Sequence, residues 1–230
     1  MSLDRPAVDS ARDEVPIRGD SAIRRLVDVV VSAVALAVAS PLLVLIAAFV
    51  KAESRGPVIY TQERIGKHGR PFRIVKFRSM VADAERLGPL VSGRRDPRIT
   101  RVGAILRATK LDELPQLVNV LRGDMTLIGP RADVARYVAH FTADERQLLA
   151  VRPGLTGPSA VYFTTDQASE LDGVTDPDAY YVAHQLHPKL ALDLDYLRCR
   201  SVTADIGILW RTVSVLAGPG ARHGEMRSPS

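Results

Sequence analysis

The chain has 230 residues, which is enough for one domain of ordinary size with a hydrophobic core. Apolar residues make up 46% and charged residues 25%, and the net charge is +5, so anionic partners such as nucleic acid, nucleotide phosphates or anionic lipid are expected. The single cysteine, Cys199, excludes an intramolecular disulfide and a thiolate metal cluster, and the five scattered histidines form no H-E-x-x-H pair.

Residues 29–50 form an uncharged apolar run of 22 residues, which would measure about 33 Å as a straight helix and could cross a bilayer. A single transmembrane anchor is therefore the simplest interpretation. A cleaved signal peptide fits poorly, because the leader would carry several acids and strong hydrophobicity resumes after the A-x-A-like site at 37–39.

Two features favour a re-entrant segment instead. Ser40-Pro41 interrupts the run, and proline bends a helix because it lacks the N–H and clashes with the carbonyl four residues back. Arginines and lysines flank the run on both sides, and positive charge favours the cytoplasmic face. We therefore predict a membrane helix over 21–52, broken at Ser40-Pro41, whose two ends lie on the same face, with the Ser40 hydroxyl satisfying a carbonyl freed at the bend.

The rest of the chain reads as a mostly helical α+β body over 53–217, between disordered tails at 1–20 and 218–230. Short strands are predicted at 56–63 and 71–78 with a turn between them. Helices are predicted at 80–87, 102–108, 114–121, 132–141 and from about 190 to 216, with a capping box at 142–145 that starts a helix reaching about 151. Residues 154–163 are predicted to be extended, and 164–190 irregular.

The most informative stretch is K-L-D-E-L-P-Q-L-V-N-V-L-R-G-D-M-T-L-I-G-P-R at 110–131. Proline is tolerated only in the first turn of a helix, so Pro115 places Asp112 and Glu113 at or just before a helix N-terminus. The plain alternative is that Asp112 is an N-cap and Glu113 a partner of the helix dipole.

Arginines and lysines crowd the same neighbourhood, and a helix N-terminus is a natural seat for phosphate. A carboxylate placed there can bind Mg²⁺ or attack phosphorus to form an aspartyl phosphate. For most of the arginines, however, a solvated surface charge remains the alternative. Signatures of P-loop nucleotide hydrolases, dinucleotide enzymes and serine esterases do not occur in the sequence.

With these pieces assembled, the sequence resembles the bacterial sugar transferases, the monotopic polyprenyl-phosphate phosphoglycosyl transferases, from about residue 24 to 216. The matching blocks are R-R-L-V-D at 24–28, S-P at 40–41, Q-E-R-I-G at 62–66, K-F-R-S-M at 76–80, D-P-R-I-T-R-V-G at 96–103, L-D-E-L-P-Q-L-V-N-V-L-R-G-D-M at 111–125, I-G-P-R at 128–131 and V-R-P-G-L-T-G at 151–157.

The resemblance implies transfer of a sugar-1-phosphate from a UDP-sugar to undecaprenyl phosphate with release of UMP, as a membrane step of surface glycan or exopolysaccharide synthesis. It implies that Asp112 forms a covalent phosphosugar intermediate, that Asp112 and Glu113 bind Mg²⁺ (Mn²⁺ being the alternative), and that the membrane segment is re-entrant at the cytoplasmic face of the bacterial inner membrane. The phosphate- and substrate-binding residues implied on the matching blocks are Arg107, Arg131, Lys76, Arg78 and Arg152.

The chain resembles the minimal catalytic form of the family, and it departs from the family pattern at several positions. Ala132 follows G-P-R where a proline is usual, Pro158 and Ser159 replace an aromatic stretch, and Lys110 stands where a small hydroxyl residue is more common. These departures leave the identity of the transferred sugar open. The sequence also does not identify the glycan pathway or any homo-oligomer.

Two alternatives to an active transferase are a membrane-tethered scaffold without turnover and a nucleic-acid-binding module. The intact carboxylate pair argues against the first, and no motif supports the second.

Overall fold

A computed structural model of the chain describes residues 17, 19–162 and 169–217. The predicted C-terminal tail, 218–230, and most of the predicted N-terminal tail lie outside the described residues. Asp20 is described, and its carboxylate pairs with Lys67 at 2.9 Å and with Arg152 at 3.0 Å. Ile17 packs against the core as well, so both of these residues of the predicted tail belong to the folded body.

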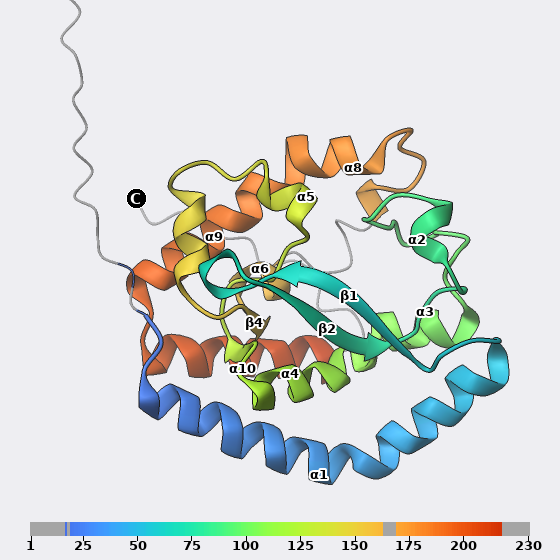
Figure 1. Ribbon diagram of the computed structural model, residues 1–230, viewed down its shortest axis with the longest axis horizontal. Helices are drawn as coiled ribbons and strands as arrows, with labels where there is room; N and C mark the ends of the chain where they lie inside the picture. Colours follow the sequence, from blue (N-terminus) through green and yellow to red (C-terminus); the bar gives the residue numbers. More distant parts are fainter. Residues whose placement is uncertain (1–16, 18, 163–168, 218–230) are drawn as a thin grey trace, which may run out of the picture.

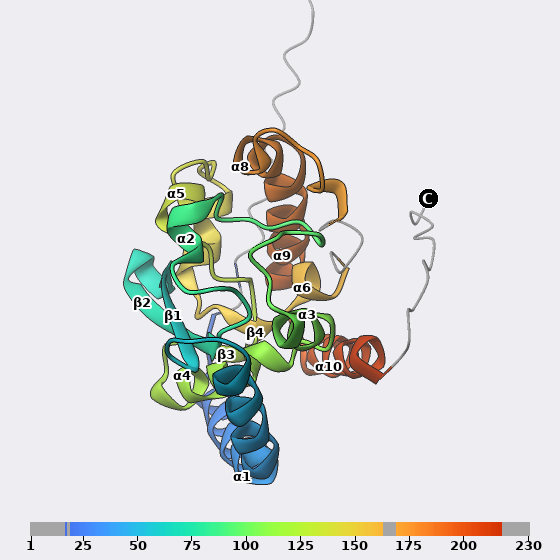
Figure 2. The same ribbon diagram turned by 90° about the vertical axis from the view of Figure 1, so that its right-hand side faces the viewer.

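A long apolar helix, α1 (Ala22–Glu53), lies along one edge of the molecule, with α4 (Leu117–Arg122) beside it (Figures 1 and 2). It is the one helix of the described part that is long and apolar enough to cross a membrane, with a mean hydropathy of 2.7 over its most apolar stretch, of which only 11% is buried. A core helix of a soluble protein would be mostly buried, so this exposure favours contact with lipid.

The helix does not break at Ser40-Pro41 as the sequence predicted; α1 is continuous, and Figure 1 shows it bowed. Pro41 cannot donate to the carbonyl of Ala37, and the Ser40 hydroxyl donates to that carbonyl instead at 2.8 Å. The predicted role of Ser40 is therefore confirmed. One replacement hydrogen bond keeps the helix intact through the proline.

Both ends of α1 are bonded to the body. Near its start, the Arg25 guanidinium donates to the carbonyls of Val120 and Leu121 at 2.5 and 2.8 Å. At its end, Glu53 accepts hydrogen bonds from the backbone N–H groups of Arg101 and Val102 at 2.8 and 3.0 Å, and so helps to cap the helix α3 (Arg101–Ala108). The bowed helix α1 is thus hydrogen-bonded to the body at both of its ends.

The predicted hairpin is confirmed with a shift of a few residues. Strands β1 (Ile59–Ile65) and β2 (Pro71–Phe77) pair antiparallel, and the turn between them contains the short 3-10 helix η1 (Lys67–Gly69). The β-branched and aromatic residues of both strands suit a half-buried ribbon. The helix predicted at 80–87 is reduced to α2 (Ala84–Leu87), because Met80 instead forms an isolated bridge with Ile99.

The central segment runs from α3 (Arg101–Ala108) through the 3-10 helix η2 (Leu111–Gln116) into α4 (Leu117–Arg122). Strand β3 (Thr126–Ile128) then pairs in parallel with β4 (Gly154–Thr156). The two strands approach closely: a Cβ at Gly157 would lie 2.1 Å from the carbonyl oxygen of Gly129, so only glycine fits there. This close approach sets the backbone just before Arg131.

The C-terminal part is more helical than predicted. The segment predicted to be extended turns helical at α6, and the described portion of the stretch predicted to be irregular contains a helix, a π-helical segment and the start of α9. The capping box is confirmed, since Thr142 and Glu145 exchange backbone-to-side-chain hydrogen bonds of 2.8 and 3.3 Å. The elements are α5 (Ala135–Val138), η3 (Glu145–Ala150), α6 (Pro158–Tyr162), α8 (Pro177–Tyr180), η4 (Tyr181–Leu186, π-helical), α9 (His187–Cys199) and α10 (Val202–Ala217).

One apolar core joins these elements. Val120 of α4, Met125 before β3, and Leu186 and Leu197 around α9 are each at most 1% exposed, and they belong to a single cluster of buried residues. A second, smaller cluster packs Ile46 and the end of α1 against α3. The fold class is thus a mostly helical α+β body with one long apolar N-terminal helix, as predicted.

Candidate active site

The carboxylate pair lies in the first turn of η2. Lys110 precedes this 3-10 helix in the left-handed conformation, with φ at 56°, and its side chain does not cap the helix. A left-handed backbone at a residue other than glycine is costly and tends to persist at functional sites. The alternative in which Asp112 serves as an N-cap is therefore wrong, because Asp112 stands two residues inside the element.

Asp112 is 6% exposed, and its Oδ1 atom is buried without a hydrogen-bond partner among the described residues. Burial, and then the charge of the adjacent Glu113, raise the pKa of Asp112. A buried carboxylate oxygen without a donor costs free energy, and such groups are retained where they have a catalytic or ligand-binding task.

Glu113 is held differently. Its carboxylate pairs with the Arg131 guanidinium at 3.3 Å. Burial by itself would raise the pKa of Glu113, but Arg131, Lys110 and Lys76 lower it to about 2, and Glu113 in turn raises the pKa of Arg131. The environment therefore pushes the pKa values of two adjacent carboxylates in opposite directions, which is a common basis for different roles in catalysis.

A pocket of about 770 Å³ adjoins the pair. Asp112 and Glu113 are not on its lining, but the cations that act on them are: Lys76, Lys110 and Arg131. Its walls come from the hairpin, the 79–92 loop, α3, α6 and the π-helical segment. The basic residues on this lining are Arg64, Lys76, Arg78, Arg86, Arg98, Arg107, Lys110, Arg131 and Lys189.

The same lining carries three acids, Asp83, Glu85 and Asp133, so the pocket has a clear excess of positive charge. Burial lowers the pKa of Lys76 to about 8, partly against the opposing effect of Glu113. Burying so many like charges together costs free energy, and it is expected where an anionic ligand offsets their repulsion. The pocket is of the size and charge that suit a substrate with two phosphates.

Four of the five predicted phosphate-binding residues line this pocket: Lys76, Arg78, Arg107 and Arg131. Arg107 donates to the Ser92 hydroxyl at 2.5 Å, and its charge is one of those that oppose the raised pKa of Asp112. Arg131 follows β3 on the Gly129-Pro130 turn and pairs with Glu113. The structure thus brings the predicted pair and these cations together.

Two of the predicted residues, Arg78 and Arg152, donate hydrogen bonds to backbone carbonyls. Arg78 lies along the pocket wall, but its NH2 group donates to the Ser54 carbonyl at 2.8 Å and its NH1 group to the Arg55 carbonyl at 3.1 Å. It therefore holds the end of α1. Arg152 is not on the pocket lining; it donates to the Gly123 carbonyl and pairs with Asp20. Arg78 thus bonds the end of α1 from the pocket wall, whereas Arg152 bonds segments away from the pocket.

Several lining residues of the pocket were not predicted from the sequence. Arg64 and Lys189 flank Asp133, and burial raises the pKa of this aspartate against the effect of both cations. Lys189 also lies over the Tyr181 ring, 4.7 Å from its centre. Tyr181 and Lys189 belong to the stretch predicted to be irregular, and a π-helical segment, which often marks a functional site, has no simple sequence signal.

The metal predicted at Asp112 and Glu113 can be judged by the donors present. No cluster of three or more His, Cys, Asp or Glu side chains suited to a metal occurs in the described part of the chain. Mg²⁺ is nevertheless commonly bound by one or two carboxylates together with substrate phosphates and water. The partnerless oxygen of Asp112 beside a cation-lined pocket fits that mode, and does not fit an all-protein metal cage.

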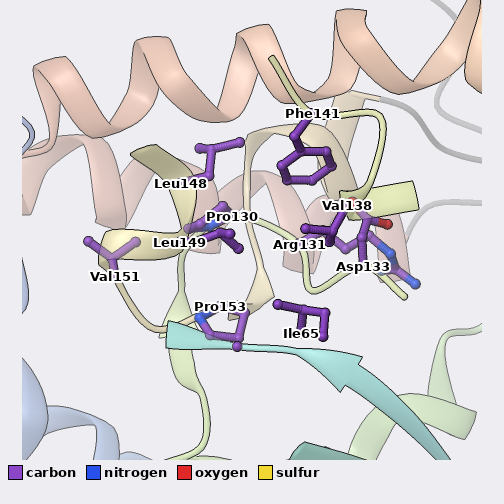
Figure 3. A pocket seen from close by; sticks show the side chains of 11 residues that line it. Ile65, Pro130, Arg131, Asp133, Val138, Phe141, Leu148, Leu149, Val151 and Pro153 are labelled. Carbon is purple, nitrogen blue, oxygen red and sulfur yellow. The ribbon is translucent and has the colours of Figure 1, made fainter. Parts of the chain in front are cut away.

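A second, much smaller cavity of about 20 Å³ lies behind the Pro130-Arg131 turn (Figure 3). Figure 3 shows Ile65, Val138, Phe141 and leucines around it, so most of its wall is apolar. It has room for one water molecule and not for a substrate. It is a packing void beside the site.

These features are those of an enzyme that handles phosphate esters at a membrane. Residues 19–218 match the bacterial sugar transferase family. The UDP-glucose:undecaprenyl-phosphate glucose-1-phosphate transferase of Caulobacter vibrioides is 39% identical over 196 residues, which cover 84% of this chain and 69% of that protein. The exopolysaccharide production protein PSS of Rhizobium leguminosarum bv. phaseoli is 37% identical over 201 residues, covering 84% and 94%.

A third relative transfers a different sugar by its name. The UDP-N-acetylgalactosamine-undecaprenyl-phosphate N-acetylgalactosaminephosphotransferase of Aeromonas hydrophila is 36% identical over 204 residues, covering 87% of this chain and 45% of that protein. The chain thus spans about two thirds of the Caulobacter relative and under half of the Aeromonas one. It belongs to the bacterial sugar transferase family, as the matching blocks predicted, and is an enzyme of the sugar-1-phosphate transferase type.

Proposed function

We propose that this chain transfers a sugar-1-phosphate from a UDP-sugar to undecaprenyl phosphate, releasing UMP, for the synthesis of a bacterial surface polysaccharide. The observation that carries the proposal is the buried, partnerless oxygen of Asp112 beside a pocket with an excess of positive charge. The names of the Caulobacter and Aeromonas relatives support the donor and acceptor classes. Because those two names give different sugars, the sugar itself is left open.

In the first step, an Asp112 carboxylate oxygen attacks the phosphorus that bears the sugar. A new P–O bond forms to Asp112 as the bond from that phosphorus to the bridging oxygen breaks, and UMP leaves with the bridging oxygen. The raised pKa of Asp112 makes its oxygen a better nucleophile, and the surrounding cations offset the charge of the diphosphate. The intermediate is a sugar phosphate bound covalently to Asp112.

In the second step, an oxygen of undecaprenyl phosphate attacks the same phosphorus. The P–O bond to Asp112 breaks, which restores the carboxylate and yields a sugar on a lipid diphosphate. Glu113 stays ionised next to Arg131 across the ordinary pH range, since its pKa is about 2. Its role is then to keep the Arg131 guanidinium aimed at the pocket rather than to carry a proton.

Mg²⁺ suits this arrangement, with Mn²⁺ as an alternative, and Asp112 and Glu113 are the residues that would hold it. When bound, such an ion neutralises phosphate charge and polarises the phosphoryl oxygens. Arg107 and Arg131 supply fixed positive charge at the same pocket, and the Ser92 hydroxyl orients Arg107. These side chains bind and orient the diphosphate independently of the ion.

We infer also that α1 enters the membrane and returns to the cytoplasmic face. Arg25 near its start and Glu53 at its end both bond to the same small body, whereas a spanning helix has its ends on opposite faces. The exposed apolar side chains Ile206, Trp210 and Val213 of α10 support contact of the body with lipid as well. This arrangement brings a lipid-linked phosphate to the level of the pocket.

The activity is tested with the full chain purified in detergent and a panel of radiolabelled UDP-sugars, with undecaprenyl phosphate as acceptor. Labelled lipid product is expected from at least one donor with Mg²⁺ present, and much less after chelation. An active wild type that releases UDP instead of UMP would contradict the phosphoryl-transfer chemistry. No product from any donor would contradict the proposed function.

The topology is tested by cysteine labelling in a Cys199→Ser background. Single cysteines at Ala22 and Ala52, both exposed at the ends of α1, should react with a membrane-impermeant maleimide in inverted vesicles and be protected in intact spheroplasts. Labelling of the two positions from opposite sides would mean that α1 spans the bilayer.

A further inference from the structure

A second buried aspartate lies close to the site without belonging to the pair. Asp193 of α9 is 1% exposed and is not on the lining of the large pocket. Its carboxylate accepts three hydrogen bonds: from the backbone N–H of Arg131 at 3.1 Å, from the backbone N–H of Ser159 at 3.0 Å, and from the Ser159 hydroxyl at 2.8 Å. Three donors thus converge on one carboxylate.

The backbone is hydrogen-bonded on both sides of Arg131: after it, the Ala132 carbonyl accepts from the Arg64 guanidinium at 3.1 Å and the Asp133 carbonyl from the Ile65 N–H at 2.8 Å. The β3–β4 pair continues to the Pro130 carbonyl, which accepts from the Gly154 N–H at 2.8 Å. Arg131 is the next residue, and there the strand pairing ends. Its N–H would face a buried region without a strand partner, and Asp193 supplies the acceptor.

The direction of the Arg131 side chain depends on this backbone. Its guanidinium reaches Glu113 at 3.3 Å and lines the large pocket, while its N–H is held by Asp193 from the other side. We propose that Asp193 is a positioning residue, which sets the Arg131 backbone so that its guanidinium meets both Glu113 and the substrate diphosphate. This inference rests on the proposed function for the identity of the ligand.

Two observations argue against a general packing role. A buried residue that serves only to fill space is usually apolar, and here burial raises the pKa of Asp193 to about 6, so keeping the charge at neutral pH costs stability. All three of its hydrogen bonds come from groups outside α9, at Arg131 and Ser159, so the carboxylate joins two other segments rather than only filling space. We infer that the carboxylate is retained because its two oxygens accept these hydrogen bonds.

The test is a double-mutant cycle between Asp193→Asn and Arg131→Ala in the full chain. The readouts are kcat with the active UDP-sugar and the affinity for UDP. An amide offers one acceptor in place of two, so Asp193→Asn should lower both quantities by about tenfold or more through misplacement of Arg131. In the Arg131→Ala background the same change should alter each by less than about twofold.

Asp195→Asn is the matched control, because Asp195 lies two residues along α9 with a 72% exposed side chain and should leave both readouts unchanged. Ser159→Ala is a second variant that leaves the Arg131 N–H bond in place. Because Ser159 also lines the large pocket, its effect is compared between two backgrounds, and it should be the same within about twofold in the wild type and in Arg131→Ala. A loss in Ser159→Ala that disappears in the Arg131→Ala background would show that the bond to Ser159, and not the bond to the Arg131 N–H, carries the effect, and would overturn the inference even where Asp193→Asn does not fold.

Losses that multiply in the double variant would also overturn the inference, since Asp193 would then act independently of Arg131. If the cycle shows the coupling in UDP affinity but the wild type transfers no sugar phosphate, the proposed function is contradicted and the positioning role of Asp193 still holds. A wild type that does not bind UDP would contradict both.

Discussion

Two aspartates of this protein, Asp112 and Asp178, are equally buried but differ in the hydrogen bonds that their carboxylates accept. Asp112 and Asp178 are each 6% exposed. Asp178 accepts hydrogen bonds from the N–H groups of Leu90 and Val91 at 3.1 and 3.3 Å, from Arg136 at 3.0 Å and from the Tyr137 hydroxyl at 2.6 Å. Asp112 keeps one oxygen buried with no partner in the described part of the chain.

The difference indicates where the protein accepts a cost in stability. The donors around Asp178 join the 88–92 loop to α5 and α8, so its charge stabilises the wall of the pocket. The Oδ1 atom of Asp112 is buried without a hydrogen bond from the described part of the chain, so its burial costs free energy that no bond offsets. Equal burial thus accompanies a structural role at Asp178 and, in the proposed reaction, a chemical role at Asp112.

The largest effect expected from this comparison is the loss of turnover in Asp112→Asn. An amide is a poor nucleophile, so kcat should fall by at least about 10³-fold. The melting temperature should stay the same or rise, because the amide does not carry a buried charge. Rate assays and thermal melts of the purified variant check both points; an active, folded Asp112→Asn enzyme would mean that Asp112 is not the nucleophile.

The opposite result is expected at Asp178. Asp178→Ala leaves two loop amides and the Tyr137 hydroxyl without their acceptor, so the free energy of unfolding should fall by about 3 kcal/mol. Thermal and denaturant melts measure this, with Asp195→Asn as the surface control. If Asp178→Ala melts like the wild type, hydrogen bonding at a buried carboxylate does not distinguish the two sites.

A smaller effect is expected at Arg131. Arg131→Ala should lower kcat by about 10- to 100-fold, because one preorganised charge is lost from the pocket. It should also raise the pKa of Glu113 from about 2 toward its ordinary value of 4.5, so that protonation on the acid side begins at a higher pH. The pH profiles of both forms measure this shift. An unchanged acid limb would contradict the pairing of Glu113 with Arg131.

The smallest predicted effect is a pH dependence of stability at Asp193. Its pKa is raised from 3.8 to about 6 in the folded state, so between these values the folded protein keeps a proton that the unfolded chain has lost. The free energy of unfolding therefore falls as pH rises through this window, by an amount on the order of 1–3 kcal/mol. Denaturant melts of the wild type and Asp193→Asn should differ in this slope, and parallel curves would contradict the raised pKa.

Local signals in the sequence predicted much of this protein. The hairpin, the capping box at Thr142 and Glu145, and the Ser40 hydrogen bond each depend on residues within a few positions of one another. The pair at 112–113 was singled out by its place at a predicted helix N-terminus among many cations, with helix capping left as the alternative. Arg107 and Arg131 were assigned from the family resemblance, and spacing alone did not separate them from the other arginines.

The features that the sequence did not predict have a common physical cause. Arg78 and Arg152 bind backbone carbonyls in segments far from them in sequence, at the end of α1 and at Gly123. No spacing rule shows that an arginine is already occupied by tertiary contacts. The π-helical segment, with its pocket-lining Tyr181, was likewise missed because packing against the core, and not helix propensity, sets its conformation.

The central claim, that Asp112 forms a covalent bond to phosphorus, can be tested by intact-protein mass spectrometry. The full chain is incubated with Mg²⁺ and the active UDP-sugar without any lipid acceptor, and quenched in acid. We expect the wild type to gain the mass of one sugar-1-phosphate residue and Asp112→Asn to gain none. Turnover by a wild type that never carries this adduct, or the same adduct on Asp112→Asn, would contradict the account.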